Sequence, residues 1–461
     1  MLDQNVAREV LACAIRTGGD FAEIYVEDRV DNDLTMRSGR IETVNSGRLH
    51  GAGVRVFNGT NAVYVYTNDT SRAGLLDCAA KAAAAVNGGK GTTIAPFQPV
   101  NYARPEEVLY LPTSVKAARK AEKMRAADAA ARAVSDEIVQ VTVGYADSVQ
   151  DVCVCNTEGV FATDRRVWSR LRCVAVASNG KENQIGSDSP GAGMGFEIFD
   201  SRIDPERSGR LAATQAVTML HAPLCPAGMM PVVIDNGFGG VIFHEACGHS
   251  LEATSVGVGL SEFCGKLGQR VAAPCVTAVD DGTILNEWGS LHMDDEGLPT
   301  TKLILIDKGI LTNYMIDKLG GRRMNMPTTG SSRRQSYAYA PTSRMRNTYI
   351  AAGEDDEAEM IATMGDGLYA KKMGGGSVNP ATGEFNFAVS EGYLVKDGKV
   401  VHPVRGASLI GRGSEVLAKI DRVGRDMQMG QGMCGSVSGS IPTNVGQPMI
   451  RVSSLTVGGQ G

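Results

Sequence analysis

Two histidines, His244 and His249, stand five residues apart in a segment whose pattern otherwise predicts a single helix from Gly239 to Glu252. Histidines that bind one metal ion from a helix are usually four residues apart, because that spacing places both side chains on one face. Five residues turn a regular α-helix by about 500°, which leaves the two side chains about 140° apart. A regular helix therefore cannot present both imidazoles to one ion.

Two interpretations of this spacing are open. Either the pattern is accidental, or the helix contains one extra residue as a π-bulge, a distortion that realigns the two faces and recurs at functional sites. Gly248, directly before His249, is the residue type that tolerates such a distortion. Glu245 follows the first histidine, as the general base does in zinc peptidases. A metal site here therefore requires a bulged helix.

A catalytic zinc ion takes three protein ligands and keeps one position open for water. Three residues are candidates for the third ligand. Glu252 lies three residues beyond His249 on the same helix face, His292 lies in an acidic segment, and Cys434 lies in a glycine-rich loop that gives a thiolate free access. Residue chemistry alone ranks Glu252 and Cys434 about equally.

The composition is that of an ordinary globular enzyme, with 43% apolar and 21% charged residues. A net charge of −5 argues against direct binding of nucleic acid, which needs a basic face to neutralise phosphates. The N-terminus lacks the pattern of a signal peptide, and no apolar run is long enough to span a bilayer. Ten scattered cysteines fit a reducing compartment. We therefore expect a cytoplasmic protein without a membrane partner.

A chain of 461 residues is expected to form two or more domains. Residues 1–225 predict a mixed α+β region in two sub-units, with a break near 88–112 and with helices over 5–17, 71–85, 114–133 and 205–219. Separate strands are expected near 138–145, 152–156 and 170–177. The composition changes near 222–228, where glycine becomes frequent. Residues 226–461 predict a predominantly β domain that carries the zinc-bearing helix and a second helix near 355–364. The fold class is therefore α+β.

The segment from His244 to Glu252 resembles the signature of the TldD/PmbA family of metallopeptidases, and specifically of its metal-bearing TldD branch. Further blocks match in the same order across the C-terminal half: Asp294-Asp295-Glu296-Gly297, Ser336-Tyr337-Ala338, Arg346-Asn347-Thr348-Tyr349, Gly374-Gly375-Gly376-Ser377-Val378, Ser390-Glu391-Gly392-Tyr393-Leu394, Gly432-Met433-Cys434-Gly435 and Val445-Gly446-Gln447-Pro448. The segment 436–440 departs from the more polar stretch of the family, which leaves substrate preference open.

The resemblance implies a function and a set of site residues. Its zinc ligands fall on His244, His249 and Cys434, and its catalytic glutamate falls on Glu245. It implies Zn²⁺ as cofactor, unfolded or extended peptides as substrate, and a dimer, formed with a second copy or with a metal-free paralogue. The family has also been described as a modulator of DNA gyrase, and the acidic chain gives no support for direct contact with DNA.

The triplet Gly374, Gly375 and Gly376 is a candidate substrate site, because it can expose a strand edge to which an extended peptide adds by backbone hydrogen bonds. A flexible hairpin is the plainer interpretation of the same triplet. A rival function is a non-catalytic peptide-binding or scaffold protein with a structural or vacant metal site. Glu245 distinguishes the peptidase from the scaffold protein, because a structural zinc ion needs no carboxylate beside its first ligand.

Overall fold

The computed structural model describes residues 2–86, 88–89, 91–104, 107–379 and 381–459, and its α+β class is as predicted. The N-terminal half forms one eight-stranded sheet with the order β3-β2-β1-β5-β6-β4. Two further strands, β7 and β8, also pair with β6. Its strands are β1 (Phe21–Arg37), β2 (Arg40–Asn58), β3 (Asn61–Thr67), β4 (Gln98–Asn101), β5 (Ile138–Asn156), β6 (Val160–Ser178), β7 (Asn183–Asp188) and β8 (Gly191–Ala192).

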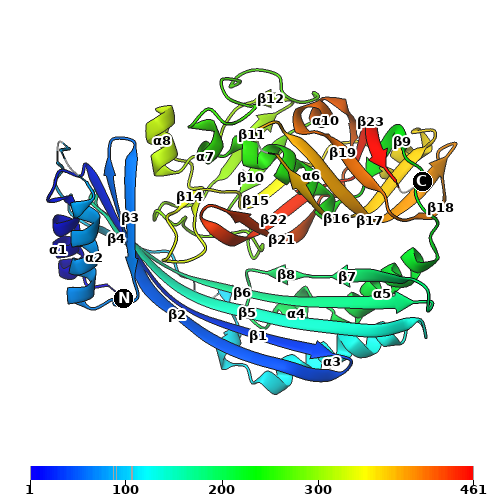
Figure 1. Ribbon diagram of the computed structural model, residues 1–461, viewed down its shortest axis with the longest axis horizontal. Helices are drawn as coiled ribbons and strands as arrows, with labels where there is room; N and C mark the ends of the chain where they lie inside the picture. Colours follow the sequence, from blue (N-terminus) through cyan, green and yellow to red (C-terminus); the bar gives the residue numbers. More distant parts are fainter. Residues whose placement is uncertain (1, 87, 90, 105–106, 380, 460–461) are drawn as a thin grey trace.

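Four strands of this sheet are much longer than the sequence pattern indicated. β1 has 17 residues, and β2, β5 and β6 have 19 each, so that segments expected as separate strands, such as 138–145 and 152–156, are continuous. They sweep as one curved sheet beneath the C-terminal domain (Figure 1). β1 pairs with β5, so the strands before and after the predicted break at 88–112 lie side by side. Residues 90, 105 and 106 of that segment lie outside the described residues.

The two faces of the curved sheet have different partners, as the period of two along a strand requires. Cys153 and Cys155 of β5 pack on one face with α1 and α2, whereas Val152 and Val154 lie in a cluster with Met293 of the C-terminal half. Further along the same strands, α3 and α5 pack on β5, β6 and β7. The N-terminal helices are α1 (Gln4–Ile15), α2 (Arg72–Ala84), α3 (Ala117–Arg132), α4 (Ile198–Ser201) and α5 (Pro205–His221).

The C-terminal half contains two larger sheets and a short β13–β14 ladder (Ser332–Arg333, Thr342–Ser343). The seven-stranded sheet consists of β9 (Gly228–Ile234), β16 (Gly367–Val378), β17 (Glu384–Lys396), β18 (Lys399–Val404), β19 (Ser408–Arg412), β20 (Ile420–Val423) and β23 (Ile450–Gly458). The six-stranded sheet consists of β10 (Ala278–Asp281), β11 (Lys302–Asp307), β12 (Ile310–Leu311), β15 (Asn347–Ile350), β21 (Gln428–Ser436) and β22 (Gly439–Gln447).

The segment predicted as one helix from Gly239 to Glu252 is a chain of short helical pieces. A 3-10 turn (Gly237–Gly240) leads into α6 (Val241–Phe243), a π-turn (His244–Gly248) and a second 3-10 turn (His249–Leu251). These pieces contact β15, β21 and β22 of one sheet and β16 and β17 of the other. The helix expected near 355–364 is α9 (Glu357–Ala362), and α7 (Ala253–Val256), α8 (Lys318–Met324) and α10 (Gly413–Lys419) were not predicted.

A buried network of charges joins the curved sheet to the C-terminal domain. Arg55 of β2 donates to Glu23 of β1 at 3.0 Å and to Glu296 at 2.6 Å, and the Arg55 side chain is only 2% exposed. Arg166 of β6 pairs with Asp295 at 2.7 Å, and Arg334 reaches back to Glu23 at 3.0 Å. The acidic turn at 294–296 therefore lies between the two halves as the partner of arginines from the sheet.

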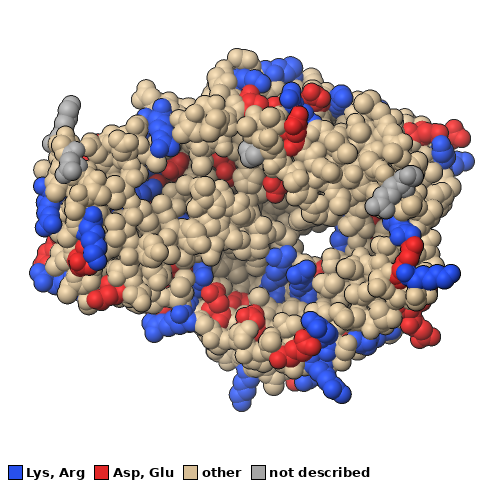
Figure 2. Space-filling model, in the orientation of Figure 1, with Lys and Arg blue, Asp and Glu red and all other residues tan. Residues whose placement is uncertain are grey.

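Charges of both signs are interspersed on the surface that Figure 2 shows, and an opening separates the curved sheet from the C-terminal domain. A cavity of about 350 Å³ lies between the two halves, with Gln150 and Trp168 of the sheet on one side and Met433 of β21 on the other. Among the described residues, no helix is both long enough and apolar enough to cross a membrane.

Replacing Arg55 by methionine tests the network between the two halves. The R55M variant removes the arginine that pairs with the buried Glu296, while Glu23 keeps Arg334, and breaking such a buried pair typically costs about 3–5 kcal/mol. We expect a fall of that size in the free energy of unfolding, measured by urea denaturation. Arg48→Met is the matched control, because Arg48 also lies on β2 and pairs with a carboxylate of β1 but is exposed. Equal effects of the two substitutions would contradict the assignment.

Candidate metal centre

The π-turn aligns the two histidines that a regular helix would separate. The His249 backbone N–H donates to the His244 carbonyl oxygen, five residues earlier, instead of to the usual fourth residue. The extra residue brings the two imidazoles together, with ring centroids 5.2 Å apart. The bulge that the five-residue spacing required is therefore present.

Gly248 lies in close contact with a buried side chain, that of Met345. A Cβ atom on Gly248 would lie 2.2 Å from the Sδ atom of Met345, far inside van der Waals contact. Met345 itself is buried, with 1% of its surface exposed, so its side chain has little room to move away. The same turn is approached from the other side by Gly413, whose Cβ would lie 2.5 Å from the Ala246 carbonyl oxygen.

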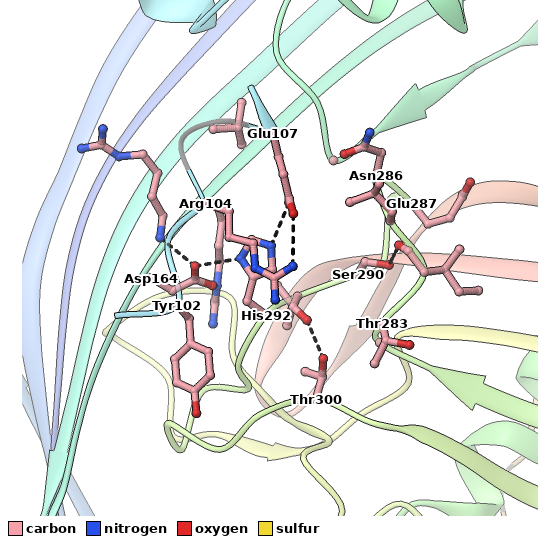
Figure 3. A pocket seen from close by; sticks show the side chains of 18 of the residues that line it. Tyr102, Arg104, Glu107, Asp164, Thr283, Asn286, Glu287, Ser290, His292 and Thr300 are labelled. Carbon is pink, nitrogen blue, oxygen red and sulfur yellow. Dashed lines mark hydrogen bonds and ion pairs between the residues drawn. The ribbon is translucent and has the colours of Figure 1, made fainter. Parts of the chain in front are cut away.

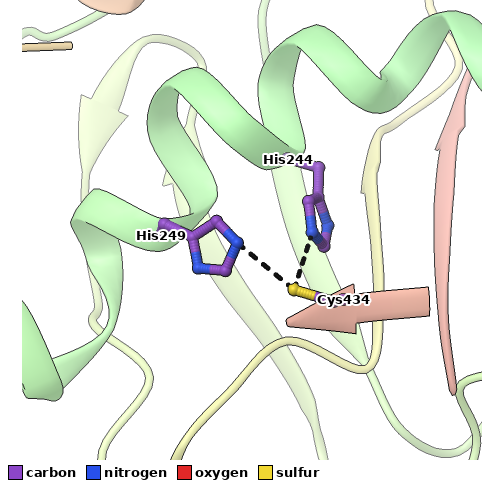
Figure 4. A group of neighbouring side chains, drawn as sticks. All are labelled: His244, His249 and Cys434. Carbon is purple, nitrogen blue, oxygen red and sulfur yellow. Dashed lines mark hydrogen bonds between the residues drawn. The ribbon is translucent and has the colours of Figure 1, made fainter. Parts of the chain in front are cut away.

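Cys434 of β21 completes a group of three donor atoms (Figure 4). Its Sγ atom lies 3.3 Å from Nε2 of His244 and 3.2 Å from Nε2 of His249. All three donors lie within 4.8 Å of one another, although Cys434 is 190 residues from His244 in the sequence. Two elements therefore build the group: the π-turn brings the imidazoles and the β21 strand brings the thiol.

The three side chains influence one another's charge. Burial alone would raise the pKa of the Cys434 thiol, but His244 and His249, by charge and by hydrogen bonding, outweigh burial and lower that pKa to about 3. Burial alone would lower the pKa of His249, but the Glu252 carboxylate and the Cys434 sulfur outweigh it and raise the pKa well above its usual value. Cys434 is therefore a thiolate at neutral pH, the form that binds metals.

Two glutamates flank His249 in different ways. Glu252, which was a candidate third ligand, accepts a hydrogen bond from Nδ1 of His249 at 3.2 Å and is 2% exposed. Glu252 thus contacts the imidazole nitrogen that faces away from Cys434. Glu245 projects its Oε2 atom to within 3.8 Å of Nε2 of His249, and 30% of its side chain is exposed. Glu245 therefore lies beside the donor group in contact with solvent.

His292, the remaining candidate ligand, lies in a separate pocket of about 260 Å³ (Figure 3). Its Nδ1 atom is 3.0 Å from Asp164 of β6 and its Nε2 atom is 3.1 Å from Glu107. A neutral imidazole has only one N–H, so both contacts are hydrogen bonds only when His292 is protonated. His292 therefore bridges two carboxylates of the N-terminal half.

Gly374, Gly375 and Gly376 lie on β16, where the pairing with β17 shifts register between Met373 and Gly376. Only Leu368 to Ala370 of β16 pair with β9, so the glycines extend beyond that neighbour. A Cβ on Gly376 would clash with Phe387 at 2.2 Å, whereas one on Gly375 would meet open space. Both β16 and β17 contact the π-turn. The triplet thus forms a bulge on a strand beside the donor group.

Two comparisons with known proteins identify the family. Models of the PmbA/TldA metallopeptidase match the chain in three successive parts: domain 1 at residues 22–86, the central domain at 110–220 and the C-terminal domain at 227–459. These matches define the class as a family of metallopeptidases. The chain belongs to the PmbA/TldD metallopeptidase family.

Similar curated proteins carry the name metalloprotease. A metalloprotease TldD homologue of Haemophilus influenzae is 37% identical over 449 residues, which cover 95% of this chain and 93% of the relative. A metalloprotease of Methanothermobacter thermautotrophicus is 32% identical over 445 residues, covering 95% of this chain and 96% of the relative. The resemblance suggested by the sequence motifs is thereby confirmed.

Solved structures share the fold over the whole chain. A protein of Thermotoga maritima that is named as a candidate modulator of a DNA gyrase superposes with a TM-score of 0.80 at 21% identity, covering 99% of this chain and 100% of the other. TldE of Thermococcus kodakarensis superposes with a TM-score of 0.76 at 16% identity, covering 98% and 99%. At these identities the likeness shows the fold alone.

The ion pairs of His292 should make the stability of the protein depend on pH. Its hydrogen bond to Asp164 raises the pKa of His292 above its usual value of about 6.5, against the opposing effect of burial. Stability from the charged form is therefore fully present below about pH 6.5 and is lost as the pH rises through the raised pKa. We expect His292→Gln to lower the free energy of unfolding by about 1–3 kcal/mol at pH 6, and by less at pH 9.

Urea denaturation of wild type and variant across this pH range measures the difference. His221→Gln is the control, because His221 also pairs with a carboxylate, Glu137, but its side chain is 60% exposed. The control should change stability much less at both pH values. A difference for His292→Gln that grows with rising pH would contradict the assignment.

Proposed function

We propose that the chain is a zinc-dependent peptidase in which His244, His249 and Cys434 hold the metal and Glu245 transfers the proton. The observation that carries the proposal is the convergence of two imidazole nitrogens and a thiolate at one point. Zinc bonds of about 2.3 Å to sulfur and 2.0–2.1 Å to nitrogen, in tetrahedral geometry, separate the two atoms by about 3.5 Å. The distances of 3.2 and 3.3 Å here are close to that value.

The donor set also fits zinc in its chemistry. Two histidines and a cysteine are three ligands, which leave the fourth position of a tetrahedral ion open. Cys434 is 5% exposed and is ionised, and a buried thiolate is stabilised by a cation. When bound, zinc would supply Lewis-acid chemistry, which activates a water molecule and polarises a peptide carbonyl.

The chain's own residues then have distinct roles. Glu245 is near enough to His249 to reach a water molecule at the centre, and its Oε2 atom accepts the proton of that water and returns it to the leaving amide nitrogen. Glu252 accepts from Nδ1 of His249 and so holds the single proton of the neutral, metal-binding imidazole on Nδ1, with the Nε2 lone pair directed toward the centre. The exposure of Glu245 allows water to enter, whereas Glu252 is closed off from solvent.

Extended or unfolded peptides are the proposed substrates. The glycine triplet offers backbone groups on β16, a strand that contacts the π-turn, where an added strand could bind without sequence-specific side-chain contacts. A second copy of the chain or a metal-free paralogue is the proposed partner.

Replacing Glu245 by glutamine tests the proposed role. The E245Q variant keeps the three donors and should bind zinc as the wild type does, while cleavage of an unfolded peptide falls by about 10²- to 10⁴-fold, the usual contribution of a general base. Zinc content by mass spectrometry and peptide cleavage are measured on the same preparation. Unchanged cleavage would refute the role of Glu245, and absence of cleavage by the zinc-loaded wild type would favour the scaffold alternative.

A further inference from the structure

Arg344 is completely buried and forms hydrogen bonds with the strand that carries Cys434. Its Nη2 atom donates to the Cys434 carbonyl oxygen at 2.6 Å. Its Nη1 atom donates to Ser438 Oγ and to the Gly439 carbonyl oxygen, both at 2.9 Å, in the turn that joins β21 to β22. One guanidinium therefore fixes the hairpin on both sides of its turn.

The same guanidinium faces the glutamate that contacts His249. The Nε atom of Arg344 lies 3.9 Å from Oε1 of Glu252, and Glu252 accepts from Nδ1 of His249 through its other oxygen. The Arg344 and Glu252 side chains are 0% and 3% exposed, so their interaction is weakly screened by solvent. Arg344 is thus linked to two of the three donors, to Cys434 through the backbone and to His249 through Glu252.

The residues next to Arg344 anchor its own segment to the histidine-bearing segment. Ser343 Oγ accepts from the Thr254 backbone N–H at 3.0 Å, two residues beyond Glu252. Met345 packs against Gly248 of the π-turn. Arg344 is therefore held in register with the histidine-bearing segment by the residues on either side of it.

We propose that Arg344 is a positioning residue of the metal centre, which fixes the Cys434 strand relative to the Glu252–His249 pair. The proposal rests on the metal centre proposed above. The planar guanidinium contacts three backbone or hydroxyl oxygens and one carboxylate from a single position, and a lysine ammonium cannot reproduce that set. Without it, the thiolate and the imidazoles would belong to two elements whose separation is less restricted, and zinc would bind more weakly.

Arg346 provides a matched control, because it is equally buried and lies two residues along the same segment. It donates to Asp280 at 2.7 Å and to the Gly330 carbonyl oxygen at 2.8 Å, and within the described part of the chain it forms no hydrogen bond or ion pair with Cys434, His249 or Glu252. If zinc affinity falls only because a buried arginine is replaced, both variants should lose it. If Arg344 positions the ligands, only the Arg344 variant should lose zinc affinity.

The experiment compares wild type, Arg344→Lys and Arg346→Lys. Zinc affinity is measured by competition with a chromophoric chelator, and the cobalt(II)-substituted proteins are examined for the thiolate-to-cobalt charge-transfer band. We expect Arg344→Lys to bind zinc about 10- to 100-fold more weakly, the usual cost of removing a group that orients a ligand, and to show a shifted or weakened band. Arg346→Lys should match the wild type in both measurements.

Equal zinc affinity and an unchanged band in Arg344→Lys would overturn the positioning role, and so would an equal loss in both variants. Failure of the wild type to bind zinc would instead refute the metal centre. If circular dichroism shows that Arg344→Lys is unfolded, Ser438→Ala tests the positioning role in its place, because it removes one hydrogen-bond acceptor of Arg344 and leaves the others. A few-fold loss of zinc affinity in Ser438→Ala would support the proposal, and an unchanged affinity would overturn it.

Discussion

The hydrogen bond from the His249 N–H to the His244 carbonyl oxygen is the constraint on which the centre depends. It adds one residue to a helical turn and so places two imidazoles, five residues apart, beside the same cysteine. Such turns are uncommon because their backbone geometry is unfavourable, and they persist where the surrounding packing determines them. Here Gly248 leaves room for Met345, and Gly413 approaches Ala246 from the other side.

The second constraint is that the centre spans elements far apart in the chain. Cys434 reaches the histidines on a strand of the six-stranded sheet, and the strand is held by Arg344 as well as by its pairing with β22. The curved N-terminal sheet is held to this domain through Arg55, Arg166 and the acidic turn at 294–296. The same sheet therefore forms one wall of the cavity that reaches Met433.

The sequence predicted those features that depend on local chemistry. Helices α1, α2, α3 and α5 lie close to the expected ranges, because apolar periodicity and capping residues such as Ser71 and Asp204 are local signals. The bulge followed from an angular argument about two histidines. The choice of Cys434 over Glu252 came from family resemblance, and the structure brings Cys434 to both histidines while Glu252 contacts His249 from its other side.

Other features depend on tertiary contacts that no local pattern reports. The long strands looked interrupted because their helix-covered face packs on α1 and α2 at one end and on α3 and α5 at the other. Arg344 was one of several arginines close in sequence, and only the fold distinguishes it from Arg346. His292 looked like a ligand because acidic residues flank it in sequence, but its partners, Asp164 and Glu107, come from the other half of the chain.

Zinc K-edge X-ray absorption of the zinc-loaded protein tests the central claim most directly. A centre made of His244, His249 and Cys434 predicts one sulfur at about 2.3 Å, with imidazole nitrogens at about 2.0–2.1 Å. The sulfur contribution should disappear in Cys434→Ala and persist in Cys247→Ala, because Cys247 is buried within the π-turn but is not among the three donors. A wild-type spectrum without sulfur, or a sulfur contribution that survives in Cys434→Ala, would contradict the account.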